Sequence, residues 1–551
     1  MKRFKKLLCV VLAVMTMSVL FAGCGKNDGE ANDSGSAEFE KIKVAYATNN
    51  VDETFVTMKN AYETVVGPTL NIEFMFSEAL KDTGAMTTFI ENAYAAGCQG
   101  VIVDLSSGID QAAAVCNDLG MWFVGISSAD AAENMEMEKY VSVVGAGAAG
   151  VAAAVGAAKA GAKTLLVERN AYLGGEAANS GVNCFCGFYT CGSDPVRVVK
   201  GIGQLVLDEM RALGPTIAEE ISASGNRDII FQPEYLKCAL DNLLEKEHVD
   251  YFLHTVLIGA ETVENEIRTI QCADDEGLFT VSAKAFVDAT GDANLSRLAG
   301  AKLIWGNDGG HPQAATLTFR LSGVAADVDL SPAAVERAVV RAKAEGIRNL
   351  TREKGFILRM ENSGIVHVLL PSIIPEGLSA EEMTRMERET RKQVLGYIQA
   401  LRTYMPGMEH SELAVIGPSI GFRETRKLVG KETITADDVI SGRKRPDGVA
   451  RGGWKPEIHR DVNKMATYME VKSGSYFDIP LGALQSENVK NLFGAGRMIS
   501  ADEAAFAAVR VMGTCFATGH AAGVGAACLA VDERAEIEHV REILKEQNAL
   551  V

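Results

Sequence analysis

The chain lacks the excess of positive charge that a nucleic-acid-binding protein needs. Its 551 residues include 54 Lys and Arg against 72 Asp and Glu, which gives a formal net charge of −18. Because attraction to phosphates depends on a basic face, and no basic stripe with interleaved aromatic residues occurs, we expect no nucleic-acid partner. Cysteine pairs with metal-ligand spacing, clustered histidines and paired carboxylates are also missing, so no metal site is predicted.

Long apolar runs are scarce as well. The one we identify, Leu7–Ala22, follows basic residues at positions 2, 3, 5 and 6, and no later segment is expected to reach the ~20 apolar residues of a membrane-spanning helix. Residues 1–23 are therefore typical of a secretory signal. The small residues before Cys24 resemble the lipobox of bacterial lipoproteins, which implies a lipid anchor on Cys24 and a location at the cell envelope, outside the cytoplasm. The alternatives are an uncleaved signal, or a cytoplasmic protein if the N-terminal fusion is an artefact.

The sequence changes character twice before residue 139. Residues 24–40 are polar, acidic and rich in Gly and Ser, as in a flexible linker. Residues 41–138 then alternate short apolar runs with amphipathic segments, from a predicted strand at 42–47 to a predicted strand at 121–126. Strands that alternate with helices of this length predict a parallel sheet with both faces covered.

Three stretches of residues 41–138 carry a family resemblance: KIKVAYATNN, AYAAGCQGVIVDLSSG and MWFVGISSA. They resemble the first lobe of periplasmic sugar-binding proteins, which capture substrates for ABC importers. That family closes two lobes over its ligand, whereas here the text changes to VSVVGAGAAG where the chain would continue to the second lobe. We expect a spacer or a relic of gene fusion, with a ligand-sensing module as the alternative.

A dinucleotide-binding pattern begins at residue 141. The apolar run VSVV precedes Gly145-Ala-Gly147-Ala-Ala-Gly150 and an Ala-rich segment that reaches residue 160. Gly145 permits a tight turn, Gly147 lets the backbone approach a pyrophosphate, and Gly150 lets the helix pack closely on the strand. The helix N-terminus attracts phosphates, and Glu168, at the end of the next strand, suits ribose hydroxyls, with Arg169 beside it. The pattern predicts a Rossmann-type site but does not separate FAD from NAD.

Three later segments carry the distinction by resemblance. LGG at 173–175, VDATGD at 287–292 and NLFGAGR at 491–497 resemble motifs of the FAD-dependent oxidoreductases, distantly akin to the flavoproteins of fumarate reductase and succinate dehydrogenase. The resemblance spans about residue 140 to 529 and implies an enzyme with bound FAD. The cofactor-binding residues it implies are Gly174, Gly175, Gly291, Asp292, Gly496 and Arg497. Arg497 has a structural salt bridge as its alternative role.

The same resemblance implies a long helix behind the last motif, with its N-terminus facing the flavin. A helix N-terminus or an arginine stabilises the negative charge that hydride transfer leaves on the ring. Gly513 and Arg510 are the candidates for this task.

For the substrate side the candidates are Arg423, Arg426 and His459, in the motifs GFRETRKLVGKETITADDVISGRK and GGWKPEIH. Arginine matches carboxylate geometry with two parallel hydrogen bonds, and histidine exchanges protons near neutral pH. The alternatives are an ion-paired helix end at 423–426 and a histidine with an ordinary packing role. Residues 324–405 read as helical and charged, and they are expected to cover the substrate.

Cys184, Cys186 and Cys191 form the one cysteine cluster. The segment follows the LGG turn and is expected to pass near the flavin. A local packing role is favoured over a redox-active pair, and the pairing of the three thiols stays open.

Together these patterns predict an α/β protein: a Rossmann-type FAD-binding domain (139–300 and 481–551) with an inserted α+β substrate or cap region (301–480), preceded by the single parallel lobe. The predicted function is hydride transfer between FAD and a small organic substrate at the cell envelope, with an unknown electron-transfer partner. The alternative is a solute-binding lipoprotein whose C-terminal region binds nucleotide without turnover.

Overall fold

The computed structural model describes residues 41–49, 51, 53–104, 108–125, 140–221, 226–360 and 364–551. The predicted signal (1–23) and linker (24–40) lie outside the described residues. The chain divides into two compact units, Met1–Met135 and Glu136–Val551, and each is described by itself.

The first unit is built on a parallel four-stranded sheet in the order β2-β1-β3-β4. Along β1 the side chains of Ala45 and Ala47 face one layer of helices, whereas the Tyr46 side chain faces the other. This alternation is the period of two that a strand imposes. Its elements are β1 (Ile42–Thr48), α2 (Glu53–Ala61), a π-helical turn (Tyr62–Val66), α3 (Gly67–Leu70), β2 (Ile72–Phe76), α4 (Thr83–Ala95), β3 (Gly100–Asp104), α5 (Ile109–Asp118) and β4 (Trp122–Gly125). The predicted parallel sheet is confirmed, and the likeness to a sugar-binding lobe stays a prediction.

The second unit is organised by a parallel five-stranded sheet in the order β10-β6-β5-β14-β25. The strands are β5 (Tyr140–Val144), β6 (Lys163–Val167), β10 (Asp250–Phe252), β14 (Ala285–Asp288) and β25 (Leu492–Gly494). Because Phe286 of β14 pairs with Leu492 of β25, the last part of the chain adds an edge strand to the sheet that β5 begins. The predicted strand, glycine turn, helix and strand are all present.

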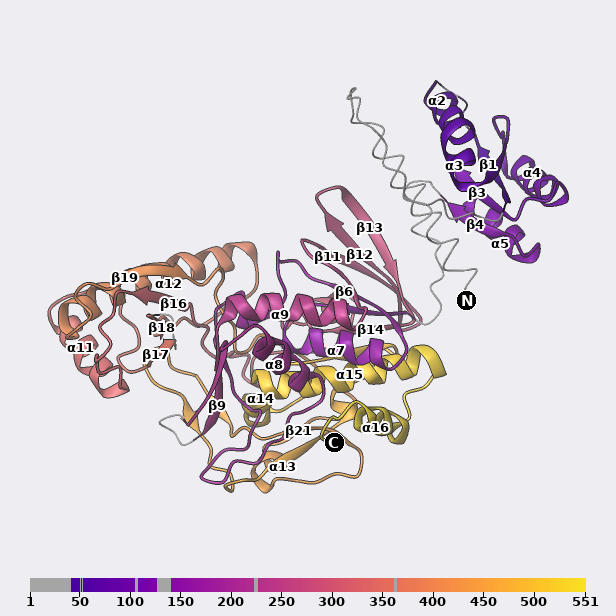
Figure 1. The fold of residues 1–551 in the computed structure, drawn as a ribbon. Coiled ribbons are helices and arrows are strands. Elements are labelled where there is room, and N and C mark those ends of the chain that lie inside the picture. The colour runs from indigo at the N-terminus through magenta and orange to yellow at the C-terminus, as the bar shows by residue number, and fades with distance from the viewer. Residues whose placement is uncertain are drawn as a thin grey trace. The chain divides into compact units, whose positions relative to one another are not determined.

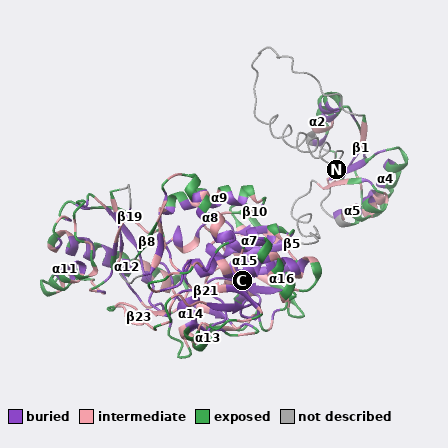
Figure 2. Ribbon diagram, turned by 60° about the horizontal axis from the view of Figure 1, so that its bottom comes forward, coloured by how far each residue is buried: buried purple, intermediate pink, exposed green. Residues whose placement is uncertain are grey.

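Two helices pack on this sheet with their backbones in contact. They are α7 (Ala148–Lys159) and α15 (Met512–Asp532), which run side by side (Figure 1). A Cβ atom added at Gly519 would overlap the main chain of Ala149, and one at Gly523 would overlap that of Ala153. Glycine is therefore required at both positions of α15, because any side chain there would push the helices apart. Both helices lie almost wholly in the buried layer of the unit (Figure 2).

Helix α15 corrects one sequence expectation. It is apolar and long enough to cross a membrane by length and composition, although we expected no such segment after the signal. Most of its residues are buried against α7 and the sheet, and its many Gly and Ala residues give it a narrow, apolar surface that packs closely there. A shorter helix, α14 (Glu503–Val509), precedes it, and residues 510–511 separate the two.

The segment 324–405 is not helical throughout. Helix α11 (Pro332–Ala344) and helix α12 (Ala380–Tyr404) cover an antiparallel sheet in the order β17-β18-β16-β19. Its strands are β16 (Phe319–Ser322), β17 (Phe356–Met360), β18 (Ile365–Leu369) and β19 (Glu412–Ile416). The runs FILRM and IVHVL pair as antiparallel strands. Each is a short, almost continuous apolar run, and the charged helices around them outweighed this signal in the sequence.

Smaller elements complete the second unit. Two antiparallel sheets have the orders β11-β12-β13 and β7-β9-β8, and three strand pairs join β15 to β20, β21 to β24 and β22 to β23. The bounds are β7 (Cys184–Phe185), α8 (Ile202–Ala212), β8 (Ile217–Ile221), β9 (Arg227–Phe231), α9 (Pro233–Lys246), β11 (Val256–Val263), β12 (Glu266–Asp274), β13 (Gly277–Ser282), α10 (Asn294–Leu298), β15 (Leu303–Trp305), β20 (Arg426–Leu428), α13 (Ala436–Ser441), β21 (Gly448–Gly452), β22 (Glu457–Ile458), β23 (Thr467–Tyr468), β24 (Phe477–Pro480) and α16 (Ile537–Glu546), with 3₁₀ turns at Gly175–Ala177 and Leu481–Ala483.

His367 of β18 makes the stability of the second unit depend on pH. Its side chain is fully buried, and burial together with the charge of Arg320 lowers its pKa to about 3. The unfolded chain takes up a proton near pH 6.5 and the folded chain does not, so the free energy of unfolding falls as the pH drops below 6.5. The free energy of unfolding of the wild type should therefore fall between pH 7.5 and pH 5. We expect this fall to be smaller by about 2 kcal/mol in His367→Met, measured by urea unfolding.

The matched control is His539→Gln, since the His539 side chain is about half exposed on α16. This control should leave the pH dependence as in the wild type. Equal pH dependence in His367→Met and the wild type would contradict the assignment.

Candidate functional site

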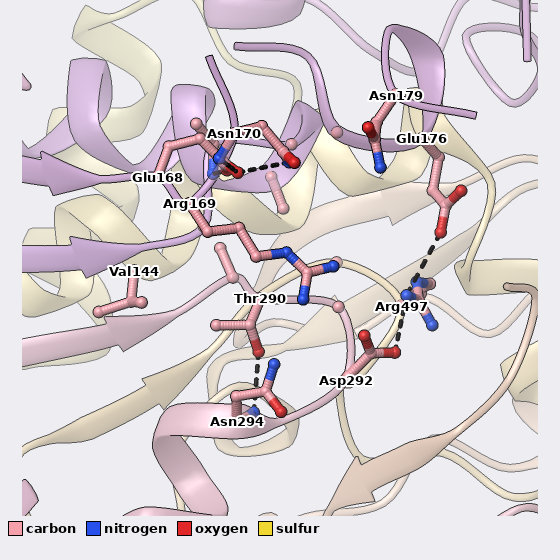
Figure 3. A pocket seen from close by; sticks show the side chains of 18 of the residues that line it. Val144, Glu168, Arg169, Asn170, Glu176, Asn179, Thr290, Asp292, Asn294 and Arg497 are labelled. Carbon is pink, nitrogen blue, oxygen red and sulfur yellow. Dashed lines mark hydrogen bonds and ion pairs between the residues drawn. The ribbon is translucent and has the colours of Figure 1, made fainter. Parts of the chain in front are cut away.

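A cavity of about 330 Å³ lies at the carboxyl ends of β5, β6 and β14 (Figure 3). Four glycine-containing segments that are far apart in the sequence line it together: Gly145–Gly147, Gly174–Gly175, Gly291 and Gly496. The structure therefore brings the first glycine fingerprint and the C-terminal glycines to one cavity. In an open parallel sheet this edge is where ligands bind.

The glycines make the cavity wall a bare backbone surface. Gly145 has φ +94°, and a Cβ atom there would lie 2.6 Å from the carbonyl oxygen of Ala289. Gly175 has φ +51°, and its Cβ would lie 2.7 Å from the Cα of Gly147. Gly150 does not line the cavity; its Cβ would overlap the Gly145 carbonyl, so it lets α7 pack on the turn as predicted.

The N-terminus of α7 opens into the same cavity. The helix begins at Ala148 after Gly147, without a side-chain cap, and Gly147, Ala148 and Ala149 all line the cavity. The first N–H groups of a helix have no partner inside the helix, and they carry a partial positive charge. This end of the cavity suits a phosphate or pyrophosphate.

Glu168 follows β6 and lies at the cavity with a buried carboxylate. It accepts hydrogen bonds from the Ala146 N–H (2.7 Å) and from the Asn170 N–H (2.9 Å) and side-chain amide (2.7 Å). A carboxylate has about four acceptor positions, so capacity remains for ribose hydroxyls. Arg169 is exposed at the rim and extends across the cavity (Figure 3).

Arg497 lies between two carboxylates on the cavity wall. Its guanidinium is 2.8 Å from Asp292 Oδ1 and 3.3 Å from Glu176 Oε1 (Figure 3). The salt-bridge alternative for Arg497 is thus confirmed, and its cofactor-binding role stays a prediction, although the residue lines the cavity. Glu176 was not identified from the sequence as a site residue. Its position directly after the LGG turn could have indicated that it lies at the cavity. The network ties the second, third and fourth glycine segments together.

These features fit FAD. A glycine wall admits a pyrophosphate, the α7 terminus supplies positive potential for it, and Glu168 can hold a ribose. The fold and the cavity thus define a dinucleotide-binding protein of the Rossmann class.

The chain belongs to the FAD dependent oxidoreductase family, which it matches over residues 141–550. Its cofactor is FAD, and the protein is an FAD-dependent oxidoreductase. Thiamine thiazole synthase of Aeropyrum pernix is 34% identical over 172 residues, which cover 28% of this chain and 56% of that protein. The chain thus spans about half the length of this curated relative.

Two solved structures resemble the chain at low identity and with low TM-scores. A geranylgeranyl bacteriochlorophyll reductase-like protein from Thermoplasma acidophilum is 15% identical, with 74% of this chain and 81% of that chain covered and a TM-score of 0.35. L-proline dehydrogenase from P. horikoshii is 11% identical, with 75% and 99% covered and a TM-score of 0.35.

A second group of polar side chains adjoins the cavity through Arg510. Arg510 lines the cavity and donates to the main-chain oxygen of Glu457 (2.9 Å). His459 Nε2 lies 3.0 Å from Glu457 Oε1. The main chain of Ala314 links the group, because its N–H donates to the His459 carbonyl (2.8 Å) and its own carbonyl accepts from Arg423 (2.7 Å). The structure brings together three residues predicted for catalysis: Arg423, His459 and Arg510.

Positive charge dominates this group. Burial, and then the charges of Arg352 and Arg510, lower the pKa of Arg423 to about 9. Among the described residues, none of these three arginines has a carboxylate within 4.0 Å of its guanidinium nitrogens, and Glu457 is the nearby anion that acts on all three. The buried Nε atoms of Arg352 and Arg510 have no hydrogen-bond partner in the described part of the chain. Such a site favours an anionic ligand.

His459 is a neutral imidazole in this group. Burial and the charge of Arg423 lower its pKa to about 3, while Glu457 stays ionised because its pKa is held low by His459 and the arginines despite burial. An ionised carboxylate only accepts hydrogen bonds, so we assign the proton to Nε2. The buried Nδ1, which has no partner among the described residues, is then a free acceptor.

Arg426 and Gly513 lie apart from this group. Arg426 pairs with Trp305 across β20 and β15, so its guanidinium emerges beside Asn294, to which it donates (2.6 Å). Residues 423–426 form no helix, so the alternative of an ion-paired helix end is wrong. Gly513 is in the first turn of α15, as predicted, but it packs on the backbone of residues 186–188 rather than lining the cavity.

Replacing Glu168 tests the ribose end of the cavity. In Glu168→Gln an NH₂ group faces either the Ala146 N–H or the Asn170 N–H, and the acceptor for ribose loses its charge. We expect the dissociation constant for FAD to rise about tenfold, measured by fluorescence titration of the apoprotein. Glu264→Gln, in the exposed turn after β11, should bind FAD as the wild type does; an unchanged dissociation constant in Glu168→Gln would refute this role.

Proposed function

We propose that the enzyme transfers hydride between FAD and a small organic substrate that carries a carboxylate. The observation that supports the substrate class is the group of three arginines, Arg352 buried and Arg423 and Arg510 half-buried, which share Glu457 as their nearby anion. An anion bound there gains charge-assisted hydrogen bonds and relieves the repulsion that lowers the pKa of Arg423. Bound flavin supplies the two-electron chemistry.

Each side chain in the group has a defined task in this proposal. Arg423 and Arg352 bind the carboxylate, and the Arg423 guanidinium is aimed by its hydrogen bonds to Ala314 O and Thr316 Oγ1, both 2.7 Å. Arg510 adjoins both the substrate and the cavity, where it stabilises negative charge. His459 Nδ1 accepts a hydrogen bond from the substrate, since Glu457 holds the ring in the tautomer that leaves Nδ1 unprotonated.

Removing the Arg423 charge tests the carboxylate site. We expect Arg423→Met to lower kcat/KM for the acid substrate at least a hundredfold, because a charged bidentate partner is lost, while dithionite still reduces the flavin normally. The measurement is stopped-flow oxidation or reduction of the flavin against a panel of enoates and hydroxy acids, each paired with its methyl ester.

Arg388→Met, on the exposed face of α12, is the matched control and should behave as the wild type. Methyl esters should react poorly with the wild type. In Arg423→Met the difference in kcat/KM between each acid and its ester should be smaller than in the wild type. Equal turnover of acids and esters, or an equal loss in Arg426→Met, would contradict the proposal.

We further propose that the enzyme is held at the cell envelope by lipid on Cys24, with residues 25–40 as its tether. The support is the signal-like sequence that ends at Cys24. We expect labelled palmitate to be incorporated into the wild type and not into Cys24→Ala, which should leave the membrane fraction. A wild type that takes up no label, with Cys24→Ala unchanged in location, would eliminate the anchor.

A further inference from the structure

Cys184 and Cys186 form a close thiol pair that the reaction proposed above does not use. Their Sγ atoms are 3.4 Å apart. Cys184 is the first residue of β7, and Cys186 is the first residue of the turn that follows the strand. A disulfide needs about 2.0 Å between the sulfurs, a distance that side-chain rotation from 3.4 Å can reach. The pair is half-buried rather than sealed in the core.

The pair does not line the flavin cavity, but its segment packs on a helix end that does. The Gly513 N–H, in the first turn of α15, donates to the Cys186 carbonyl (2.8 Å). The next residue, Gly187, has φ +85°, and a Cβ atom there would lie 2.6 Å from Val511 Cγ2. The same helix end supplies Met512 and Cys515 to the cavity wall. The cysteine segment therefore packs without a gap on the helix end that lines the cofactor site.

We propose that Cys184 and Cys186 are a redox pair that exchanges two electrons with the flavin. In the reductive direction, reduced FAD gives up two electrons and one proton, and a second proton comes from solvent. The S–S bond breaks, two thiols form, and FAD is oxidised. In the reverse direction the two thiols lose two electrons and two protons and the bond re-forms. The pair thereby stores a second pair of electrons beside the cofactor.

A metal site is the competing use of the same atoms. The two sulfurs and an Asp228 carboxylate oxygen lie within 4.8 Å of one another. Metal ligation requires thiolates. The hydrogen bond from Cys186 lowers the pKa of Cys184, but burial and the charge of Asp228 outweigh it, and both thiols have raised pKa values. Because thiol–disulfide exchange also proceeds through a thiolate, the raised pKa values do not separate the two uses, and the metal content of the purified protein decides between them.

The test is an anaerobic titration of the oxidised, FAD-loaded protein with dithionite. We expect the wild type to take up four electrons per FAD, and Cys184→Ser and Cys186→Ser to take up two. Thiols are counted in parallel by acid quenching, unfolding, alkylation and mass measurement. Two more alkylated cysteines should appear in the reduced wild type than in the oxidised wild type, and no such difference in either variant.

Three controls separate the outcomes. Cys238→Ser, exposed on α9, and Cys191→Ser should both keep four electrons. The flavin spectrum and melting temperature of each variant show that it folds and binds FAD. Uptake of two electrons by the wild type, with the same thiol count in both states, would overturn the proposal. So would loss of the second electron pair in Cys191→Ser, or a zinc ion retained by the wild type and lost in Cys184→Ser.

Discussion

The contact between the backbones of α7 and α15 is the constraint on which the rest of the second unit depends. At Gly519 and Gly523 a side chain would overlap the main chain of α7, so the two helices approach as closely as their backbones allow. One helix begins at the first glycine turn and the other ends near the C-terminus of the chain. Their contact, with β25 paired to β14, holds Gly147 and Gly496 at one cavity, although they are far apart in the sequence. A widening of this contact would separate Gly147 from Gly496 and open the cofactor site.

The cavity and the arginine group adjoin each other at the start of α15. This arrangement sets how a substrate would lie relative to the cofactor. On one side the glycine wall and the α7 terminus hold an anionic cofactor. On the other, Arg352 and Arg423 hold positive charge in a buried place where it is costly. Arg510 borders both. In the proposed function, a substrate anion bound to the arginine group would offset that cost and would orient the reacting carbon toward the flavin.

The cofactor half of the site was predictable because its information is local. Glycine spacing encodes the backbone turn at Gly145, and the acid at 168 follows a strand whose length is visible in the sequence. The substrate half was only partly predictable: Arg423, His459 and Arg510 were identified from the sequence, whereas Arg352 and Glu457 were not, since only tertiary packing brings their segments to the group. Arg426 shows the limit: it is three residues from Arg423, yet a strand pairing directs it to Asn294. The strands at 356–360 and 365–369 were also not predicted. The segments on either side of them are charged and helical, and local charge says little about strand pairing.

The most direct measurement of the central claim is hydrogen–deuterium exchange of the apoprotein with and without added FAD. The account predicts that FAD protects four separate segments together: 144–150, 168–176, 289–292 and 495–515. Protection of the first two segments without the last two would show that the C-terminal glycines do not share the cofactor site, and the account would then be wrong.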